Sequence, residues 1–338
     1  MTTRQSYTFD EDPYQTTGSA VTKASPVDTN FYFLCAVVVM GIVGTAANGA
    51  VVYAMVASKQ HKNYVLIFNQ NVLDLVSCFF LSVSSVAKLC NIRLSGTSGY
   101  WLCLVLLSDA SSWGPFLGSL INLAAITVER YVKVVHSTWA KQKLRKWTEY
   151  STIALAWIGG IGVAVAVTVP TSIVVDGVCY PAVHWNSRVA QTAFGIWYFL
   201  SFYVVILLVF VFFYWRILIA IRHHARVIAA QNAAAVSGAA QTHHSKQIQI
   251  KIIKTMLLVS LLFVVTWTPG FVYTLLVNIH LNLTVREFGF SAVLIIGYLY
   301  ICINPIIYAT HFDPVKSVLI GFIPCKKTTQ PVEIIEIA

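Results

Sequence analysis

YLYICINPIIYAT, residues 298–310, is an almost wholly apolar stretch that nevertheless carries Asn304 followed by Pro305. A proline inside a helix removes a backbone donor and clashes with the preceding turn, so it kinks or breaks the helix. The stretch therefore combines a helix breaker and a bare amide in a segment suited to an apolar environment, and this combination needs a physical explanation.

The composition of the whole chain indicates what that environment is. Of its 338 residues, 57% are apolar and 11% are charged, whereas soluble globular proteins average about 25% charged residues. The chain cannot cover its outside with charge, which indicates a membrane protein with the lipid bilayer as a partner. The net charge of +10 would suggest nucleic-acid binding only on a basic patch of a soluble domain. Here the basic residues lie between apolar runs, so we expect no nucleic-acid partner.

Seven apolar segments follow one another, and each is near or above the roughly 20 residues that a membrane-spanning helix needs. A helix that is hydrophobic all round must be buried, and a soluble protein offers no place for seven of them. We predict an all-α membrane protein, a seven-transmembrane helix bundle with a short amphipathic cytoplasmic helix after span seven. The predicted spans are Phe31–Ala57, Tyr64–Ala87, Cys103–Val132, Tyr150–Val175, Thr192–Ile221, Ile250–Asn278 and Phe288–Thr310.

Three parts are predicted along the chain. They are an extracellular N-terminal segment at residues 1–30, the bundle at 31–311, and a cytoplasmic helix and tail at 312–338. The N-terminal segment is polar and lacks the basic, apolar and small-residue pattern of a cleavable signal peptide. We therefore expect the first span to act as its own insertion signal.

The distribution of Lys and Arg predicts the orientation. An odd number of spans places the two termini on opposite sides. The first, third and fifth connections together with the C-terminal tail hold sixteen basic residues, while the N-terminus and the other connections hold six; Arg130 lies within the third span. Because basic residues mark the cytoplasmic side, we expect the N-terminus outside.

Two candidate modification sites agree with this orientation. The only Asn-x-Ser/Thr sequon starts at Asn282, on the predicted outer side, where it is a candidate for glycosylation. Cys325 stands beside Lys326 and Lys327 on the predicted inner side. That position suits reversible palmitoylation, and a free buried thiol is the alternative.

Polar side chains at membrane depth are costly, so each should face other protein or a watery cavity. Candidates are Asn48 in span one, Asp74 in span two, Glu129 and Arg130 at the inner end of span three, and Asn304 in span seven. A glutamate beside an arginine can pair with it and hold it.

Together these residues resemble the rhodopsin-like (class A) family of G-protein-coupled receptors. The motifs occur in order on six of the seven spans. They are GTAAN ending at Asn48, NVLDL containing Asp74, ERY at Glu129–Tyr131, Trp157, Phe263 with Trp267 and Pro269, and NPIIY at Asn304–Tyr308. The resemblance implies a plasma-membrane, multi-pass receptor that passes binding of an extracellular ligand to heterotrimeric G proteins, with arrestin as a further partner.

The resemblance also explains the Asn-Pro pair. In the family, span seven bends there around a small hydrated cavity, and neighbouring side chains and water satisfy the freed carbonyl. Asn304 is then expected to reach Asp74 directly or through water, with Ser119 at the same cavity. The family often binds a sodium ion here, but two usual oxygen-bearing positions are Tyr300 and Ile301. A water-filled polar cluster without sodium is the alternative.

The family's switch residues match the inner ends of the spans. In the family, activation releases Arg130 to stack against the G protein, and Tyr214 and Tyr308 support it in the active state. Many members also hold the arginine with an acidic residue on span six, where this chain has Gln249. We therefore predict a looser inactive state with measurable basal signalling.

Several expectations concern the outer half and span five. The family joins Cys103 and Cys179 by a disulfide, with Cys90 as a competitor for the bond. Cys103 lies two residues farther from Arg130 than usual, so we expect a bulge or an extra outer turn.

Span five has Ile206 where the family has a proline, which predicts a straighter helix.

The ligand pocket follows from the match and leaves the ligand open. Amine receptors carry an aspartate where this chain has Ser112; Asp109, one turn outward, could serve a larger cationic ligand or be solvated. Retinal binding is disfavoured because span seven has Tyr298 in place of the lysine. The pocket is aromatic and weakly polar, which does not name a ligand class. An uncharged pocket floor under an acidic N-terminal segment fits a peptide better than a small amine; a small amine, melatonin-like or lipid ligand is the alternative. The predicted lining includes Ser112, Phe116, Trp267, Phe271, Thr274 and Tyr298.

Other classes of function find little support. The histidine pairs at 223–224 and 243–244 show no spacing of a zinc site, so no metal is expected. The chain lacks a dinucleotide fingerprint, a phosphate loop and hydrolase motifs, so we expect no enzyme. A transporter is the remaining rival, but we find no internal repeat of the kind transporters show.

Overall fold

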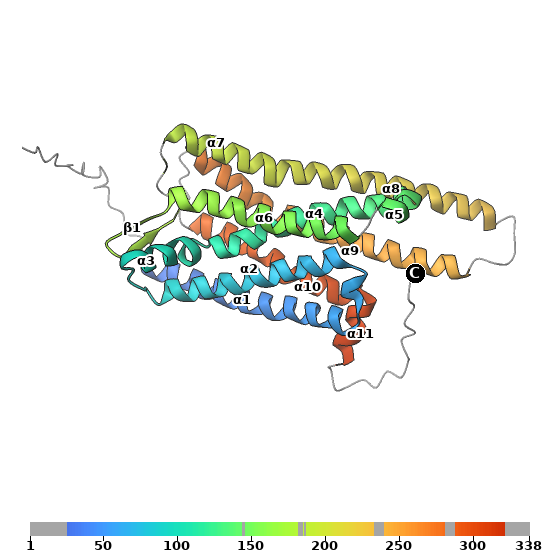
Figure 1. The fold of residues 1–338 in the computed structure, drawn as a ribbon, viewed down its shortest axis with the longest axis horizontal. Coiled ribbons are helices and arrows are strands. Elements are labelled where there is room, and N and C mark those ends of the chain that lie inside the picture. The colour runs from blue at the N-terminus through green and yellow to red at the C-terminus, as the bar shows by residue number, and fades with distance from the viewer. Residues whose placement is uncertain are drawn as a thin grey trace, which may run out of the picture.

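The computed structural model describes residues 26–143, 146–181, 185, 187–232, 240–280 and 288–321. Within these ranges the fold is a bundle of long helices lying side by side (Figure 1). Seven of the described helical segments are long and apolar enough to cross a membrane, which confirms the predicted fold class. The long helices are α1 (Pro26–Ala57), α2 (Val65–Leu89), α4 (Ala110–Val135), α6 (Lys146–Thr171), α7 (Arg188–Phe199), α8 (Val205–Asn232), α9 (Ala240–Asn278) and α10 (Phe288–His311).

Shorter elements lie at the two ends of the bundle. At one end are α3 (Gly96–Leu102) and the strands β1 (Ile173–Val175) and β2 (Val178–Tyr180); at the other are η1 (Gln60–Lys62), α5 (Ser137–Lys143) and α11 (Asp313–Gly321) (Figure 1). The helix α11 follows α10 directly, in the place predicted for the short helix after span seven.

The end of the fourth span differs from the prediction. We assigned residues through Val175 to this span, but α6 ends at Thr171 and Ile173–Val175 form β1, which pairs antiparallel with β2. The connecting residues Asp176 and Gly177 both have positive φ, 51° and 79°. An Asp-Gly pair in this conformation makes the tight turn of a hairpin, so turn chemistry ends the helix although the hydropathy continues.

Span five also departs from a regular helix. The absence of proline at Ile206 led us to expect a straighter span. The span contains a π-helical turn, η3 (Leu200–Val204), between α7 and α8, and its straightness stays a prediction. A π-turn inserts an extra residue into the α-helical ladder and often marks a functional position, so a helix without proline still gains an irregular turn here.

A close helix crossing fixes α4 against α6. Gly160 on α6 faces Gly114 and Gly118 on α4, and a Cβ added at Gly160 would lie 2.3 Å from the carbonyl oxygen of Gly114. Small residues of this kind let membrane helices approach backbone to backbone. Trp157, one turn before Gly160 on α6, lies close to α2.

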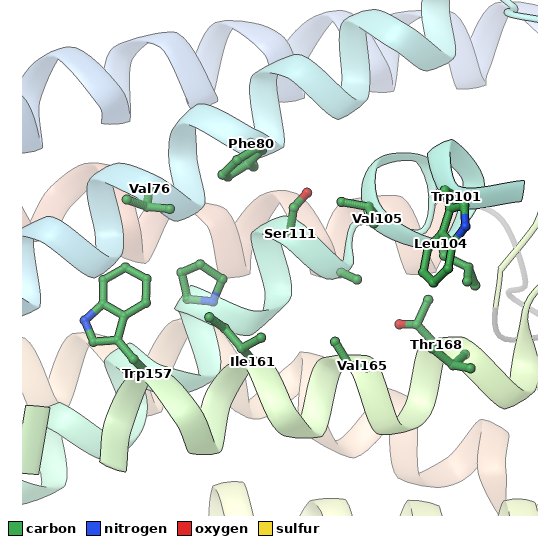
Figure 2. Close-up of a pocket in the computed structure, with 13 residues that line it drawn as sticks. Val76, Phe80, Trp101, Leu104, Val105, Ser111, Trp157, Ile161, Val165 and Thr168 are labelled. Atoms are coloured by element: carbon green, nitrogen blue, oxygen red, sulfur yellow. The ribbon is translucent and has the colours of Figure 1, made fainter. Parts of the chain in front are cut away.

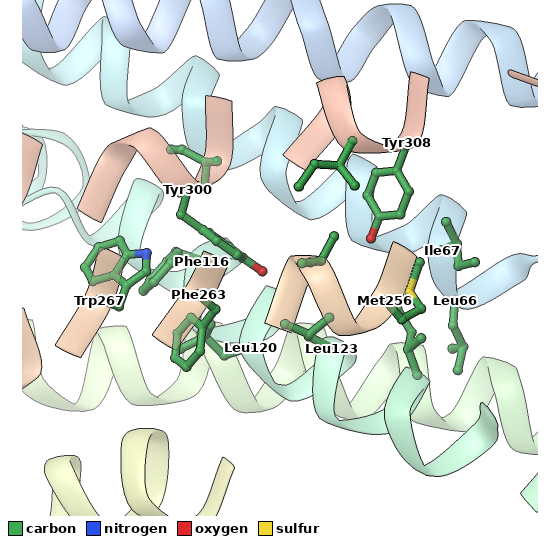
Figure 3. Packing of buried hydrophobic residues seen from close by; sticks show 14 of the residues in the cluster. Leu66, Ile67, Phe116, Leu120, Leu123, Met256, Phe263, Trp267, Tyr300 and Tyr308 are labelled. Atoms are coloured by element: carbon green, nitrogen blue, oxygen red, sulfur yellow. The ribbon is translucent and has the colours of Figure 1, made fainter. Parts of the chain in front are cut away.

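The hydrophobic core lies along the middle of the bundle, and the outside is apolar as well. Figure 3 shows Leu120 and Leu123 of α4 packing with Phe263 of α9 and Tyr300 of α10. On the outer surface, Ile158 is 71% exposed and several other large apolar side chains are similarly bare. Such a surface is stable only against lipid hydrocarbon, so the structure supports a multi-pass membrane protein.

Candidate functional site

The carboxylate of Asp74 joins three helices in the middle of the bundle. Asp74 on α2 is completely buried. Its Oδ1 accepts a 2.6 Å hydrogen bond from the hydroxyl of Ser119 on α4, and its Oδ2 accepts a 3.3 Å bond from the amide of Asn304 on α10. The structure thus brings together these three predicted members of the central network, and the contact between Asp74 and Asn304 is direct.

The fourth predicted member, Asn48 on α1, explains how Pro305 is accommodated inside α10. Pro305 has no N–H for the carbonyl of Ile301, four residues earlier. The amide of Asn48 donates to that carbonyl over 3.1 Å and to the carbonyl of Gly44 over 2.9 Å. A neighbouring helix therefore replaces the bond that the proline removes, as a buried carbonyl in a membrane requires.

Further amides extend the network toward α6. Gln70 donates to the hydroxyl of Ser119, and Asn122 donates to Gln70 over 2.8 Å. Asn69 donates to Asn122 over 3.1 Å and accepts from the indole of Trp157 over 3.0 Å. The sequence analysis missed these three amides. For Asn69 and Gln70 the run FNQN before Asp74 was the available signal, since consecutive polar residues inside a span are themselves costly.

These side chains form a hydrogen-bonded cluster. A hard cation such as sodium takes oxygen ligands. Asp74 and Ser119 supply oxygens, while Gln70 and Asn304 direct amide N–H groups at them and the side chain of Ile301 has no donor atom. The side-chain oxygens of Asn48 and Asn304 and the hydroxyl of Tyr300 are buried without a partner among the described residues, so the sodium site and the polar cluster without sodium both stay predictions.

At the end of the bundle where α5 and α11 lie, Arg130 is held by Glu129. The guanidinium of Arg130 is almost fully buried and donates to Glu129 over 2.8 Å. Its carbon Cζ lies 5.7 Å from the ring centroid of Tyr64, in cation–π contact, and Tyr64 packs edge-on against Phe312. The expected pairing of Arg130 with Glu129 is present in the structure, and a ring contact links it to the start of α11.

Glu129 has a second cationic partner that sequence reasoning missed. Lys133, one turn along α4, donates to Glu129 and also lies 3.6 Å from the carboxylate of Glu149 on α6. The i, i+4 spacing of Glu129 and Lys133 is the usual one for a helical ion pair, which was the available signal. The contact with Glu149 depends on how α4 and α6 are rotated.

Of the two predicted supporting tyrosines, Tyr214 has hydrogen-bond partners, while the buried hydroxyl of Tyr308 has none among the described residues. The hydroxyl of Tyr214 on α8 lies 3.4 Å from Thr127 and 3.2 Å from Ser260. Tyr308 on α10 is buried, with its ring beside Met256 and Ile67 (Figure 3). Tyr131 points to span five, where its ring packs against Phe213 at 4.9 Å.

In the other half of the bundle, the predicted pocket residues gather around Trp267. Phe116 packs against this indole at 4.3 Å between centroids, and Phe271 and Tyr298 lie at 6.2 and 6.3 Å. The prediction omitted Trp113, 5.7 Å from Trp267, and the two tyrosines that stack on Phe271. These are Tyr198 and Tyr203 of span five.

The side chains of Ser112 and Asp109, two polar members of the predicted pocket, are engaged within the protein. Ser112 exchanges bonds with Ser77 on α2: each hydroxyl donates to the other's carbonyl, over 3.0 and 2.9 Å. Asp109 forms a 2.5 Å ion pair with Lys88 and accepts from Ser84. Asp109 is therefore neither simply solvated nor free. Thr274 lies one turn beyond Phe271, and its carbonyl accepts from Asn278.

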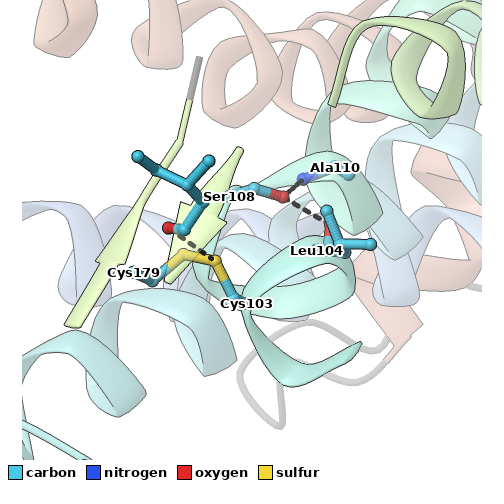
Figure 4. Close-up of a disulfide and its surroundings, with 6 residues drawn as sticks. Cys103, Leu104, Ser108, Ala110 and Cys179 are labelled. Carbon is cyan, nitrogen blue, oxygen red and sulfur yellow. Dashed lines mark hydrogen bonds between the residues drawn. A yellow bond between two sulfur atoms is a disulfide. The ribbon is translucent and has the colours of Figure 1, made fainter. Parts of the chain in front are cut away.

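A disulfide closes the same end of the bundle. Cys103 is bonded to Cys179 (Figure 4), which confirms the predicted pair, while Cys90 is free and exposed. The expected irregularity is also present: a π-helical segment, η2 (Cys103–Leu107), follows α3, and Asp109 with φ 61° starts α4. The disulfide links β2 to span three. The hairpin is therefore fixed at the same end of the bundle as the aromatic cluster.

Some predicted positions lie outside the residues that the structure describes. They are Asn282, Cys325, the N-terminal segment before residue 26, and the side chains of Gln249 and of the histidine pairs. Glycosylation and palmitoylation therefore stay predictions.

Known proteins similar to this chain agree with this geometry. Residues 47–308 match the family model described as 7 transmembrane receptor (rhodopsin family). G-protein coupled receptor 3 of Rattus norvegicus is 27% identical over 310 residues, 87% of this chain and 79% of the relative. Somatostatin receptor type 4 of the same organism is 26% identical over 320 residues, 90% and 74% of the two chains. QRFP-like peptide receptor of Branchiostoma floridae is 23% identical over 218 residues, 62% and 56%.

The fold is shared with a solved structure. The crystal structure of squid rhodopsin superimposes with a TM-score of 0.71 at 16% identity, covering 89% of this chain and 87% of that one. At this identity the likeness concerns the fold alone. The family model, which spans most of the chain, describes receptors rather than enzymes. The protein therefore belongs to the rhodopsin family of seven-transmembrane receptors.

Proposed function

We propose that this receptor transmits the binding of an extracellular peptide to heterotrimeric G proteins. The observation that carries the proposal is that contacts run from the aromatic cluster around Trp267 to the network around Asp74, and that Ser119 of this network lies on α4, the helix that also bears the buried pair of Arg130 and Glu129. In this proposal the receptor lies in the plasma membrane with its N-terminus outside, as the Lys and Arg distribution favours.

The first part of the path consists of aromatic rings. A ligand that pushes on Phe271 or Tyr298 presses on Trp267, which they both contact. Phe263, one turn below Trp267 on α9, packs edge-on against Tyr300 at 5.8 Å. Packed rings resist compression. A displacement of Phe271 or Tyr298 by the ligand therefore moves α10 at Tyr300, one residue before Ile301.

The second part of the path is polar. Movement of α10 at Ile301 alters the bonds from Asn48 and, three residues on, the bond from Asn304 to Asp74. Because Pro305 has no N–H for the carbonyl of Ile301, the bond that this carbonyl would lose when α10 moves is the one from Asn48 of α1. The central network thus couples α10 to α1, α2 and α4.

The last part is the release of Arg130. Breaking a buried ion pair is costly, about 3–5 kcal/mol, when one charge is left alone. Lys133 keeps Glu129 compensated after Arg130 departs, so release costs less here than for an isolated pair. The freed guanidinium then offers a charge and donors to a G protein, and arrestin is the proposed second partner at the same face.

A peptide is the ligand that the site favours. The cluster is broad and aromatic, and Asp109 with Lys88 adds charges of both signs at its outer edge. Two of the relatives are named as receptors for somatostatin and for a QRFP-like peptide. A small amine is disfavoured because Ser112 stands at the amine-binding position and its hydroxyl is engaged with Ser77.

The test is ligand-stimulated nucleotide exchange on membranes that contain the receptor. Pools of neuropeptides, amines and lipids are applied separately, and binding of a non-hydrolysable GTP analogue is measured. We expect a peptide pool to stimulate exchange, with no stimulation in membranes that lack the receptor. Stimulation by an amine or lipid pool alone would contradict the peptide assignment, and ligand-driven transport without exchange would contradict receptor function.

A further inference from the structure

The hydrogen bonds of Arg130 leave part of its guanidinium without a partner. The terminal nitrogen Nη2 donates to Glu129 over 2.8 Å, whereas Nε is buried and has no partner among the residues that the structure describes. Arg130 is 1% exposed, so bulk water does not reach it. A buried charge is costly unless it is both paired and hydrogen-bonded. The stability of this charge therefore depends on a further contact.

The aromatic ring of Tyr64 supplies that contact. Tyr64 directly precedes α2, and its ring centroid lies 5.7 Å from Cζ of Arg130. The face of an aromatic ring attracts a cation, and the attraction is stronger where water is excluded. The sequence analysis assigned Tyr214 and Tyr308 to Arg130 and did not select Tyr64, which belongs to none of the motifs that carry the resemblance.

Phe312 fixes the ring of Tyr64 in this position. The two rings pack edge-on, with 5.0 Å between centroids and an angle of 89° between planes, which is a favourable arrangement for two aromatic rings. Phe312 is buried and is the single residue between α10, which ends at His311, and α11, which begins at Asp313. A displacement of the end of α10 therefore also displaces the ring that lies over Arg130.

We propose that Tyr64 is a positioning residue for the switch: its ring holds Arg130 beside Glu129, and movement of the end of α10 through Phe312 withdraws the ring and frees the guanidinium. The same helix carries Asn304, which is bonded to Asp74, so the central network and Arg130 are joined through α10 as well as through α4. The role in signalling rests on the proposed coupling to G proteins, whereas the hold on Arg130 does not.

The sign of the effect follows from the state that the structure shows. Arg130 is paired with Glu129 while the ring of Tyr64 lies over it, so the ring stabilises the paired state. Removing the ring shifts the equilibrium toward the state with Arg130 released. For one cation–π contact the expected shift is about two- to thirtyfold.

Three variants separate the ring face from the hydroxyl and from packing in general. Tyr64→Leu removes the ring, whereas Tyr64→Phe keeps the ring face and removes only the hydroxyl. Phe80→Leu is the matched control, because Phe80 is also an aromatic residue of α2 that packs edge-on against another ring, that of Phe79 at 5.4 Å. Figure 2 shows Phe80 in a pocket between α2 and α6, sixteen residues from Tyr64 or about 24 Å along the helix.

The first measurement needs no G protein. Purified full-length receptor in detergent is treated with phenylglyoxal, which modifies accessible arginine side chains. Modification of Arg130 is quantified by mass spectrometry against the exposed Arg222 of the same molecule. We expect Arg130 to be modified about two- to thirtyfold faster in Tyr64→Leu than in wild type, and at the wild-type rate in Tyr64→Phe and Phe80→Leu. A wild-type rate in Tyr64→Leu, or an equal rise in either of the other variants, would overturn the proposal.

The second measurement tests the role in signalling. Basal binding of a non-hydrolysable GTP analogue is measured in membranes matched for surface receptor. The loss of a merely structural contact lowers activity, whereas release of Arg130 raises it, so we expect Tyr64→Leu to exceed wild type and phenylalanine at 64 to restore the wild-type level. Exchange in Tyr64→Leu at or below that of an active wild type would contradict the role in the switch. Faster modification of Arg130 with no exchange in any variant would support the hold by Tyr64 and contradict the proposed function instead.

Discussion

Replacing Asn48 by alanine should destabilise the receptor mainly because the carbonyl of Ile301 loses its donor. A buried unsatisfied carbonyl costs about 1–3 kcal/mol, and hydrogen bonds between membrane helices have measured values up to about 1.7 kcal/mol. We therefore expect a loss of about 1–2 kcal/mol. At roughly 2–4 °C per kcal/mol, the unfolding midpoint should fall by a few degrees.

A double-mutant cycle with Pro305→Ala isolates the mechanism. Alanine at 305 restores an N–H that can bond the carbonyl of Ile301, so Asn48→Ala should cost about 1 kcal/mol less in this background, within the usual range for coupled neighbours. The intrahelical bond from Asn48 to Gly44 is lost in both backgrounds and cancels. Asn71→Ala is the control, because Asn71 is equally buried but its amide bonds Ile67 within its own helix.

The assay is thermal unfolding of the purified receptor in detergent, followed by the fluorescence of its nine tryptophans. If Asn48→Ala costs the same with and without Pro305, or if Asn71→Ala couples to Pro305→Ala equally strongly, the explanation that Asn48 replaces the bond removed by Pro305 is wrong.

Three further predictions concern packing, the disulfide and basal activity. Gly160→Val should cost at least about 1–3 kcal/mol through overpacking and lower surface expression, whereas Gly162→Val, with open space around its Cβ position, should be tolerated; equal expression of the two variants would contradict the tight crossing. Cys103→Ser and Cys179→Ser should lower the unfolding midpoint by similar amounts, and the double variant by no more than either; additive losses would show separate roles. Receptor without added ligand should raise nucleotide exchange above that of control membranes, and Gln249→Glu should reduce this basal exchange by restoring an acidic residue on span six; exchange at the control level would contradict the looser inactive state.

Hydropathy and a few polar positions were enough to predict most of the fold and part of the site. The bilayer demands long apolar helices, so the seven spans are visible in the sequence, and motif spacing placed Asp74, Arg130 and Asn304 on the correct helices. The hairpin after α6 was missed because hydropathy continues through Ile173–Val175 while the Asp-Gly turn decides the conformation.

The partners of individual side chains were harder to predict, because they depend on the rotation and depth of each helix. Nothing in the sequence pairs Asn48 with the carbonyl of Ile301, or Lys133 with Glu149 across two helices. The amides before Asp74 are different. Asn69 and Gln70 were visible as polar residues inside a span, and the same cost argument that selected Asp74 should have selected them.

The pairing of Asp109 with Lys88 changes how the outer pocket is interpreted. From the sequence, Asp109 was either a ligand anchor or a solvated residue. In the structure its charge is already compensated by span two, so a cationic group of a ligand must compete with Lys88. A peptide that brings charges of both signs can replace this ion pair without leaving a charge unpaired.

The central claim, that one relay joins the outer pocket to a cytoplasmic docking face, is tested most directly at Arg130. Nucleotide exchange is measured for wild type and Arg130→Ala in membranes matched for surface receptor, without ligand and with the most active ligand pool. The account predicts that Arg130→Ala reduces both basal and stimulated exchange to the level of control membranes while delivery to the surface is retained. Stimulated exchange equal to that of wild type in Arg130→Ala would contradict it.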